Sequence, residues 1–222
     1  ETIAARTSVR CVIITGAGGR AFSVGGDLYQ RKNMTHEQWL RQRQVFDRLL
    51  FTLRQLRRPI IAAVHGMAYG GGCEIAISTD FIIASEEAVF GQPEGIVGLS
   101  AGGGAPVFLP RVLPPGKAMQ MLMTGDAITA QEAYRLGMVN EVHPYAALMT
   151  AVMAIAEKIA RNSPNAVQAV KRSVQLAYNE PVEQGVSIMM DEHWRSVVHP
   201  DRMEGIRAFT EGREAEYPDP QF

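Results

Sequence analysis

Three consecutive glycines, Gly70 to Gly72, join a buried strand region to the start of a helix. Small and β-branched apolar residues predict the strand over residues 59–64, and the segment from Cys73 to Ile77 predicts the helix start. A helix that begins at a glycine run presents free main-chain N–H groups and the positive end of its dipole. We therefore expect an α/β fold in which this segment is a tight turn or, together with a second glycine cluster, a source of hydrogen-bond donors to an anion.

The rest of the chain predicts strands mixed with helices as far as residue 143, followed by helices alone. Further strands are predicted at 9–15, 80–85, 88–90 and 138–142. Residues 36–56 predict an amphipathic helix with arginine and glutamine on its polar face and an apolar face made of Trp39, Val45, Phe46, Leu49, Leu50, Leu53 and Leu56. Short helices are predicted at 116–123 and at 129–136, where Thr129 and Glu132 form a capping box and Gly137 a C-cap.

Beyond Pro144, helices are predicted at 146–161, 164–178, 181–197 and 201–211, each opened by a proline or a capping residue. We therefore expect a mixed core at 1–143 and a helical region at 144–222.

Composition excludes several classes of protein. The chain of 222 residues has 22 basic and 23 acidic side chains and a net charge of -1, which gives no field that favours nucleic acid or a membrane surface. Two cysteines, Cys11 and Cys73, without CxxC or Cys/His spacing argue against a disulfide framework or a zinc site. The longest apolar run, 146–156, is shorter than the roughly 18 residues that suggest a membrane span. We expect a cytoplasmic location.

Two glutamates each follow a turn-rich stretch. Glu74 comes after the glycine run and Glu94 after Phe90-Gly91-Gln92-Pro93. On its own, Glu74 is equally a first-turn glutamate favoured by the helix dipole, and Glu94 a surface turn residue. Consecutive glycines at Gly25 and Gly26 offer a second set of main-chain donors or a tight turn. Residues 16–19 indicate a plain turn, because the third glycine of a dinucleotide motif would fall at Ala21.

Four motifs in order resemble the enoyl-CoA hydratase/isomerase (crotonase) family. They are Ala21-Phe22-Ser23-Val24-Gly25-Gly26-Asp27-Leu28, the Pro-Ile-Ile-Ala-Ala-Val run of 59–64, Gly66-Met67-Ala68-Tyr69-Gly70-Gly71-Gly72-Cys73-Glu74 and Phe90-Gly91-Gln92-Pro93-Glu94. The resemblance continues to Ala208-Phe209-Thr210-Glu211 and so covers essentially the whole chain. It implies a crotonase-like spiral of ββα units with a C-terminal helical region that forms a homotrimer or a dimer of trimers.

The resemblance also implies an acyl-CoA thioester substrate and an assignment of site residues. The backbone N–H groups of Gly26 and Gly71 would form an oxyanion hole, Glu74 would assist water attack on the β-carbon, and Glu94 would protonate the α-carbon. No separate cofactor or metal is implied, since coenzyme A enters as part of the substrate. By motif position, substrate-binding residues would be Val24, Gly25, Asp27, Leu28, Tyr69, Gly70, Pro93, Gly102, Phe209 and Arg213.

The chain departs from the family pattern at several places. Ala101 and Ala105 stand where a proline and a glycine are common, which alters the acyl pocket. Gly212 stands where a lysine often contacts CoA phosphate, and the neighbouring Arg213 is the candidate substitute. The family has a β-hairpin and a helix before its first strand, but only residues 1–8 stand there in this chain, which does not begin with methionine. We therefore expect this N-terminal part to be missing.

The function expected from this resemblance is enoyl-CoA hydration. Within the family, the alternatives are a Δ3,Δ2-enoyl-CoA isomerase or a specialised dehydratase, and the presence of both glutamates favours hydration. A serine peptidase of related fold needs a serine at the helix start, where this chain has Cys73 and Glu74. A non-catalytic RNA- or ligand-binding member is disfavoured by the near-zero net charge and by the glutamate pair.

Overall fold

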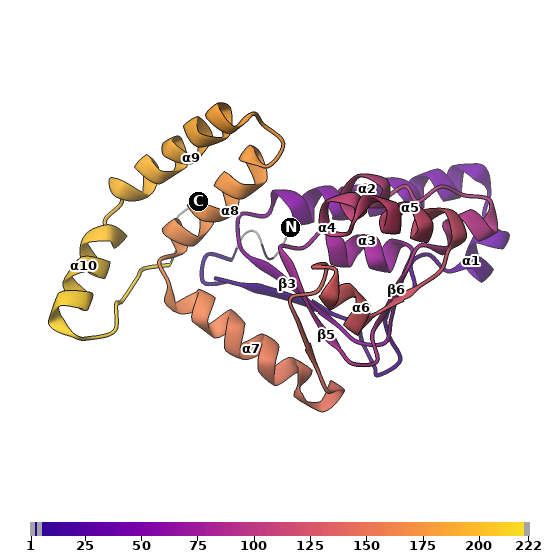
Figure 1. Cartoon of the computed structure of the whole chain (residues 1–222), viewed down its shortest axis with the longest axis horizontal. Helices are drawn as coiled ribbons and strands as arrows, with labels where there is room; N and C mark the ends of the chain where they lie inside the picture. The colour runs from indigo at the N-terminus through magenta and orange to yellow at the C-terminus, as the bar shows by residue number, and fades with distance from the viewer. Residues whose placement is uncertain (1–2, 4–5, 220–222) are drawn as a thin grey trace. The chain divides into compact units, whose positions relative to one another are not determined.

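The computed structural model describes residue 3 and residues 6–219, which form two compact units (Figure 1). The α/β unit consists of residues 13–55 and 60–153. The helical unit consists of the chain before Ile13, Leu56–Pro59 and the segment from Ala154 onward. Over the described residues, every helix is too short or too polar to cross a membrane. The predicted division at residue 143 stays a prediction.

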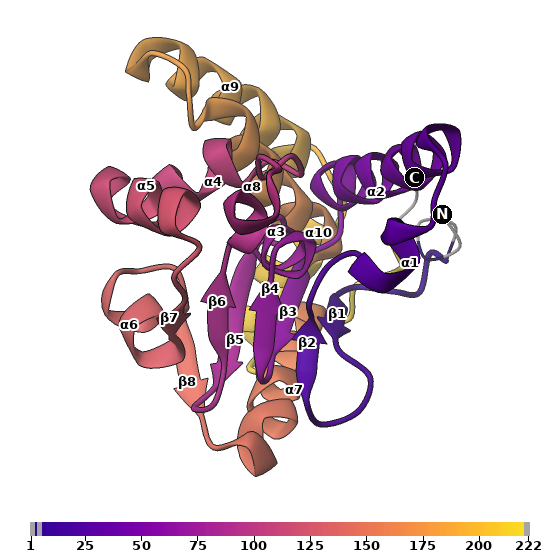
Figure 2. The same ribbon diagram turned by 90° about the vertical axis from the view of Figure 1, so that its right-hand side faces the viewer.

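Two four-stranded sheets form the frame of the α/β unit (Figure 2). The first has the order β1 (Val12–Thr15), β3 (Ile60–Val64), β5 (Phe81–Ser85), β8 (Glu141–His143). The second has the order β2 (Ala21–Ser23), β4 (Met67–Tyr69), β6 (Val89–Gly91), β7 (Ile128–Thr129). Strand β4 is parallel to both β2 and β6, whereas β6 and β7 are antiparallel. The first six strands enter the two sheets alternately and a helix follows each pair, which confirms the expected ββα spiral.

The helices follow the same order along the chain. Those in the first 143 residues are α1 (Leu28–Lys32), α2 (His36–Gln55), α3 (Gly71–Ile77), the 3-10 helix η1 (Pro93–Val97), α4 (Ala105–Val112), α5 (Pro115–Thr124) and α6 (Ala130–Arg135). The later ones are α7 (Tyr145–Arg161), α8 (Pro164–Ala177), α9 (Val182–Val197) and α10 (Asp201–Glu211).

Strand β3 lies at the centre of the first sheet, and all five of its residues are buried. This is the burial expected of a strand with parallel neighbours and covered faces, and it explains the uninterrupted apolar run. Side chains at the strand ends fix the register. The Ile60 N–H donates to Asp80 Oδ2 at 2.7 Å, and the Ile82 N–H donates to Asn140 Oδ1 at 3.2 Å.

Helix α3 packs against β2 at Gly72. A Cβ at Gly72 would overlap the carbonyl group of Ser23, so only glycine permits this approach. The contact matters for function because α3 and the end of β2 carry two of the predicted site motifs.

In the helical unit, α8 and α9 pack side by side (Figure 1). Arg172 Nε on α8 donates to the buried carboxylate of Glu192 on α9 at 3.0 Å. Ser163 caps α8 by accepting a hydrogen bond from the Ala166 N–H at 3.1 Å. Proline and capping residues therefore begin these helices where the sequence predicts them.

Some boundaries differ from the predictions for identifiable reasons. The fifth strand was expected at 138–142 but begins at Glu141, because the N–H groups of Met138 and Val139 bond to Ala133 O and close the end of α6. The first strand was expected from Val9 but begins at Val12, since the Val9 carbonyl instead accepts from Arg58 Nε at 2.6 Å. The Thr129 cap is confirmed, with its Oγ1 accepting from the Glu132 N–H at 3.2 Å.

Several elements escape prediction. Strands β2, β4 and β7 have two or three residues each, too few to show an alternating pattern. Helix α4 contains Pro106 and Pro110, and proline residues in a sequence predict an interrupted helix. The apolar face of α2 is narrower than predicted, because Val45 and Leu49 are exposed in the single chain and only Leu50 and Leu53 are buried.

The Gly72 contact leads to a stability test. Gly72→Ala should lower the free energy of unfolding by about 3 kcal/mol, because the added methyl overlaps the main chain of β2. Gly116→Ala is the matched control, since a Cβ there meets nothing within 4 Å, and it should be neutral or stabilising by about 0.5 kcal/mol. Urea denaturation of both variants measures the difference. Equal stability of Gly72→Ala and the parent would contradict the packing of α3 on β2.

Candidate active site

The sheet topology brings three sequence motifs to one edge. Strands β2, β4 and β6 are parallel neighbours, so their carboxyl ends lie together (Figure 2). Residues 24–26 follow β2, residues 70–74 follow β4, and residues 92–94 follow β6. The Gly70 N–H also donates to Gly91 O at 2.9 Å, which ties the last two of these segments. Motifs about 45 residues apart along the chain thus converge.

Gly70 turns the chain from β4 into α3. It is the N-cap of α3 with φ 53° and ψ -124°, a conformation that L-residues with side chains rarely adopt. Its carbonyl accepts the first helical hydrogen bond, from the Glu74 N–H at 3.0 Å. The turn places Glu74 one helical turn from the N-terminus of α3, as the sequence predicts.

Glu74 is buried, with 2% of its surface exposed. Its Oε1 accepts a hydrogen bond from the Ala105 N–H at 3.2 Å, and a Cβ at Gly103 would overlap its Oε2. Burial raises the pKa of the Glu74 carboxyl, and the charge of Glu94 raises it further. The N–H groups of Ala105 and Gly103 and the charge of Arg43 act in the opposite direction. The raised pKa makes the Glu74 carboxylate a stronger proton acceptor than a glutamate in water.

Glu94 lies in the first turn of η1 and is half-buried. Its side chain points at the start of α3, since a Cβ on Gly70 would lie 2.8 Å from Glu94 Oε1. Burial raises the pKa of the Glu94 carboxyl, while its own backbone N–H and the charge of Arg31 oppose the rise. The charge of Glu94 also raises the pKa of Glu74, so the ionisation of Glu94 affects that of Glu74.

Gln92 is a site residue that the sequence did not single out. It is buried beneath Glu94, and its amide nitrogen donates to both Glu94 carboxylate oxygens, at 3.2 and 3.0 Å, in the orientation that satisfies both amide atoms. The only sequence signal was its place inside the Phe90–Glu94 motif. Next to it, burial raises the pKa of the Cys73 thiol to about 12, so Cys73 is a packing residue here and not a nucleophile.

The two glycine segments predicted to supply N–H donors meet in space. A Cβ at Gly25 would lie 2.9 Å from the nitrogen of Gly71, and a Cβ at Gly71 would lie 2.9 Å from the Phe46 ring. The guanidinium of Arg31, on α1, lies against Gly26. Glycine is therefore required at Gly25, where the neighbour is main chain and φ is +79°, whereas Gly26 and Gly71 face side chains. The loop after β2 adjoins the N-terminus of α3.

The remaining predicted substrate-binding residues have varied settings. Asp27 caps α1, because its Oδ1 accepts from the Tyr29 N–H at 2.8 Å. Val24 and Leu28 flank this cap and are exposed. Tyr69 ends β4 and packs on Gly91, Pro93 opens η1, and the Gly102 carbonyl accepts from Arg43.

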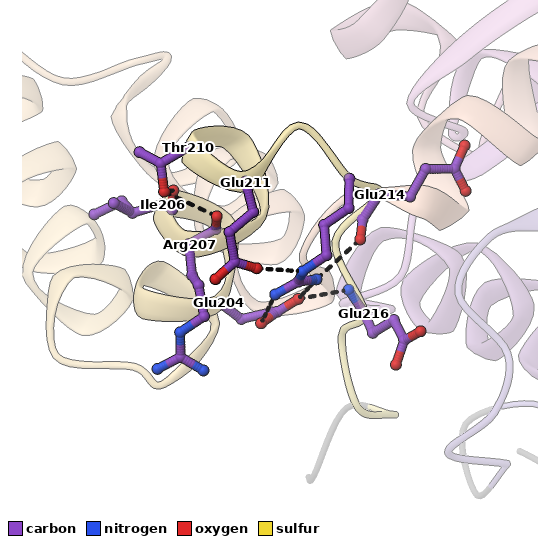
Figure 3. Close-up of polar contacts among 8 residues, drawn as sticks. Glu204, Ile206, Arg207, Thr210, Glu211, Glu214 and Glu216 are labelled. Atoms are coloured by element: carbon purple, nitrogen blue, oxygen red, sulfur yellow. Dashed lines mark hydrogen bonds and ion pairs between the residues drawn. The ribbon is translucent and has the colours of Figure 1, made fainter.

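Phe209 and Arg213 belong to the helical unit. Phe209 is 88% exposed. The Arg213 guanidinium donates to both carboxylate oxygens of Glu204, at 2.7 and 3.0 Å, and to Glu211 Oε2 at 2.7 Å (Figure 3). These pairs tie the chain after α10 back onto that helix. A role of Arg213 with CoA phosphate stays a prediction, and it would require the guanidinium to exchange carboxylate partners for phosphate.

Together these residues form a site for acid–base chemistry beside an anion-stabilising turn. One buried carboxyl and one half-buried carboxyl flank the N-terminus of α3. Such a pair holds a shared proton near neutral pH more readily than isolated glutamates do. Main-chain N–H groups at the helix start favour negative charge that develops on a bound carbonyl oxygen.

Comparison with known proteins identifies relatives of this chain. The family model described as enoyl-CoA hydratase/isomerase matches residues 1–220. The mitochondrial enoyl-CoA hydratase of Pongo abelii is 35% identical over 212 residues, 96% of this chain and 72% of the relative. The crotonyl-CoA hydratase of Syntrophomonas wolfei is 35% identical over 210 residues, 95% of this chain and 81% of the relative. The crystal structure of an enoyl-CoA hydratase from Bacillus anthracis matches with a TM-score of 0.95 and 35% identity, over 99% of this chain and 85% of that one.

The buried carboxyl at Glu74 leads to a pH-dependent stability prediction. In the folded protein the pKa of the Glu74 carboxyl lies above its ordinary value of 4.5. The contribution of this carboxyl to the free energy of unfolding is therefore fully present below pH 4.5 and is lost as the pH rises through the folded-state pKa. At pH 8 the free energy of unfolding of Glu74→Gln should therefore be about 1 kcal/mol higher than that of the parent, so the variant should unfold at a higher urea concentration. This difference should disappear at acid pH. The exposed Glu87→Gln is the control. A Glu74→Gln variant that is weaker than the parent at pH 8 would contradict the expected cost of burying this carboxylate.

Proposed function

This chain belongs to the enoyl-CoA hydratase/isomerase family, and we propose that it adds water reversibly across the 2,3 double bond of a 2-enoyl-CoA thioester by means of Glu74 and Glu94. Its similarity to enoyl-CoA hydratases identifies it as a hydro-lyase that acts on acyl-CoA thioesters. The main support for the catalytic assignment is the burial of Glu74, whose pKa is raised by that burial and by the charge of Glu94. The assignment of individual residues is our proposal.

The first proposed step is polarisation of the thioester. Its carbonyl oxygen accepts hydrogen bonds from the main-chain N–H groups of Gly26 and Gly71, which stabilise negative charge as the oxygen becomes enolate-like. The contact between Gly25 and Gly71 supports this pairing of the two segments. Loss of one such donor typically raises the barrier by about 3 kcal/mol.

The second proposed step moves water and a proton. Both carboxyl groups hold the water molecule, and Glu74 takes one of its protons as the oxygen bonds to the β-carbon. Glu94 delivers a proton to the α-carbon, which completes the hydroxyacyl thioester. The pair begins and ends with one proton, now on Glu74 instead of Glu94, so the carboxyls re-equilibrate before the next turnover.

This proposal requires no separate cofactor, because coenzyme A is part of the substrate and the donors are main-chain groups. Two carboxyls favour hydration over the isomerase alternative. We also propose a cytoplasmic location, since a chain with only two cysteines, in positions without the spacing of a disulfide framework, suits a reducing compartment.

The glutamate roles are tested by amide substitutions. Glu74→Gln and Glu94→Gln should each lower kcat for crotonyl-CoA hydration about a hundredfold or more, because each removes one proton-transfer group. Loss of the enoyl-thioester absorbance measures the rate, and circular dichroism checks the fold. Glu87→Gln, exposed in the turn between β5 and β6, should match the parent. Full activity of the Glu94→Gln variant would show that Glu94 is not the proton donor.

We further propose that the chain assembles as a homotrimer or a dimer of trimers through its C-terminal helices. Exposed apolar side chains on these helices support the proposal, among them Val170, Val174, Val186, Met190 and Trp194. Light scattering should give three or six times the mass of the chain, and a monomer at micromolar concentration would contradict assembly.

A further inference from the structure

Arg43 on α2 has a set of contacts that the proposed mechanism does not use. Its Nη2 donates to Gly102 O at 2.6 Å and lies 2.6 Å from Asp47 Oδ1. Its guanidinium also lies 5.9 Å from the centre of the Phe46 ring. A Cβ at Gly102 would lie 2.7 Å from Arg43 Nη1, so the guanidinium is packed directly on the chain at this point.

The segment that Arg43 holds is the one that holds Glu74. Gly102 precedes Gly103, whose main chain is packed against the Glu74 carboxylate, and Ala105, whose N–H donates to Glu74 Oε1 at 3.2 Å. Residues 100–102 belong to neither a helix nor a strand, so no regular pattern of main-chain hydrogen bonds fixes their path. The contact with Arg43 therefore links the long helix α2 to the main-chain donors of Glu74.

We propose that Arg43 is a positioning residue for Glu74: it fixes the 102–105 segment whose N–H groups hold the Glu74 carboxylate, and it places a positive charge beside that carboxylate. The inference rests on the proposed role of Glu74 as the base that deprotonates water. It assigns Arg43 no contact with the reacting atoms.

The charges around Glu74 give the proposal a distinctive signature. Glu94 faces Glu74 from η1, Arg43 faces it from α2, and Cys73 is its neutral neighbour on α3. Asp47 faces Arg43 from the same helix. Burial and Glu94 raise the pKa of Glu74, and Arg43 lowers it. Loss of the Arg43 charge should therefore raise the pKa, so that less Glu74 is ionised at a given pH.

The test compares Arg43→Gln with Arg43→Lys and with the control Arg41→Gln. Arg41 lies two residues away on the exposed side of α2, where it pairs with Glu37. The first readout is the pH profile of kcat/KM for crotonyl-CoA hydration. The second is the carboxyl ¹³C titration of Glu74 in ligand-free protein labelled at glutamate, assigned by its absence in Glu74→Gln.

Arg43→Gln should lower kcat about tenfold and move the acidic limb of the profile to higher pH, together with the ¹³C titration. Arg43→Lys keeps the charge but loses the planar fork, so its kcat should fall while its acidic limb stays close to that of the parent. Arg41→Gln should match the parent in both readouts.

An acidic limb and a ¹³C titration of Arg43→Gln that both overlie those of Arg41→Gln would overturn the proposal, even if kcat fell, because that is the result of a purely structural role. A shifted titration combined with full activity of Glu74→Gln would instead refute the proposed role of Glu74 as the base. The link between Arg43 and the Glu74 carboxyl would survive that outcome.

Discussion

Burial of the Glu74 carboxyl is the constraint on which the rest of the site depends. An ionised carboxylate removed from water is costly unless nearby donors and charges compensate for it. Here the compensation comes from three separate parts of the chain: the start of α3, the N–H groups of Gly103 and Ala105, and Arg43 on α2. Each of these groups stabilises the ionised form of Glu74 and so limits the rise in its pKa that burial causes. The folded arrangement of distant segments therefore sets the acidity of this carboxyl.

Parallel strand order explains how such distant segments meet. Three adjacent strands end at one edge of the second sheet, and each is followed by residues that face the others. Strand β2 has only three residues. Its position is nevertheless fixed, because it pairs within the sheet and because α3 approaches it closely at Gly72. The helices then close over an edge that is already defined.

The sequence predicted the parts of this site that carry a local signature and missed those that depend on tertiary contacts. The glycine run and, elsewhere in the fold, the Thr129 cap are visible because the backbone conformation itself selects those residue types. Glu74 is visible because it directly follows the glycine run. Strands β2, β4 and β7 carry no such signature, and α4 is disguised by two prolines. Arg43 was assigned to the polar face of α2. An amphipathic pattern distinguishes apolar from polar side chains, but it does not distinguish an arginine that faces solvent from one that contacts a loop. Gln92 was hidden in the same way inside a turn motif.

The packing around Gly71 and Gly72 also decides where this scaffold can vary. A side chain at Gly72 would overlap the main chain of Ser23, so α3 cannot accept one there without moving β2. At Gly71 the nearest atoms belong to the Phe46 ring on α2, a side chain that can be exchanged, whereas Arg43 on the same helix has to stay because it holds the main chain at Gly102. A mutant library designed to change acyl-group preference should therefore leave Gly72, Arg43 and Gly102 unchanged and diversify Phe46 and the other positions of α2.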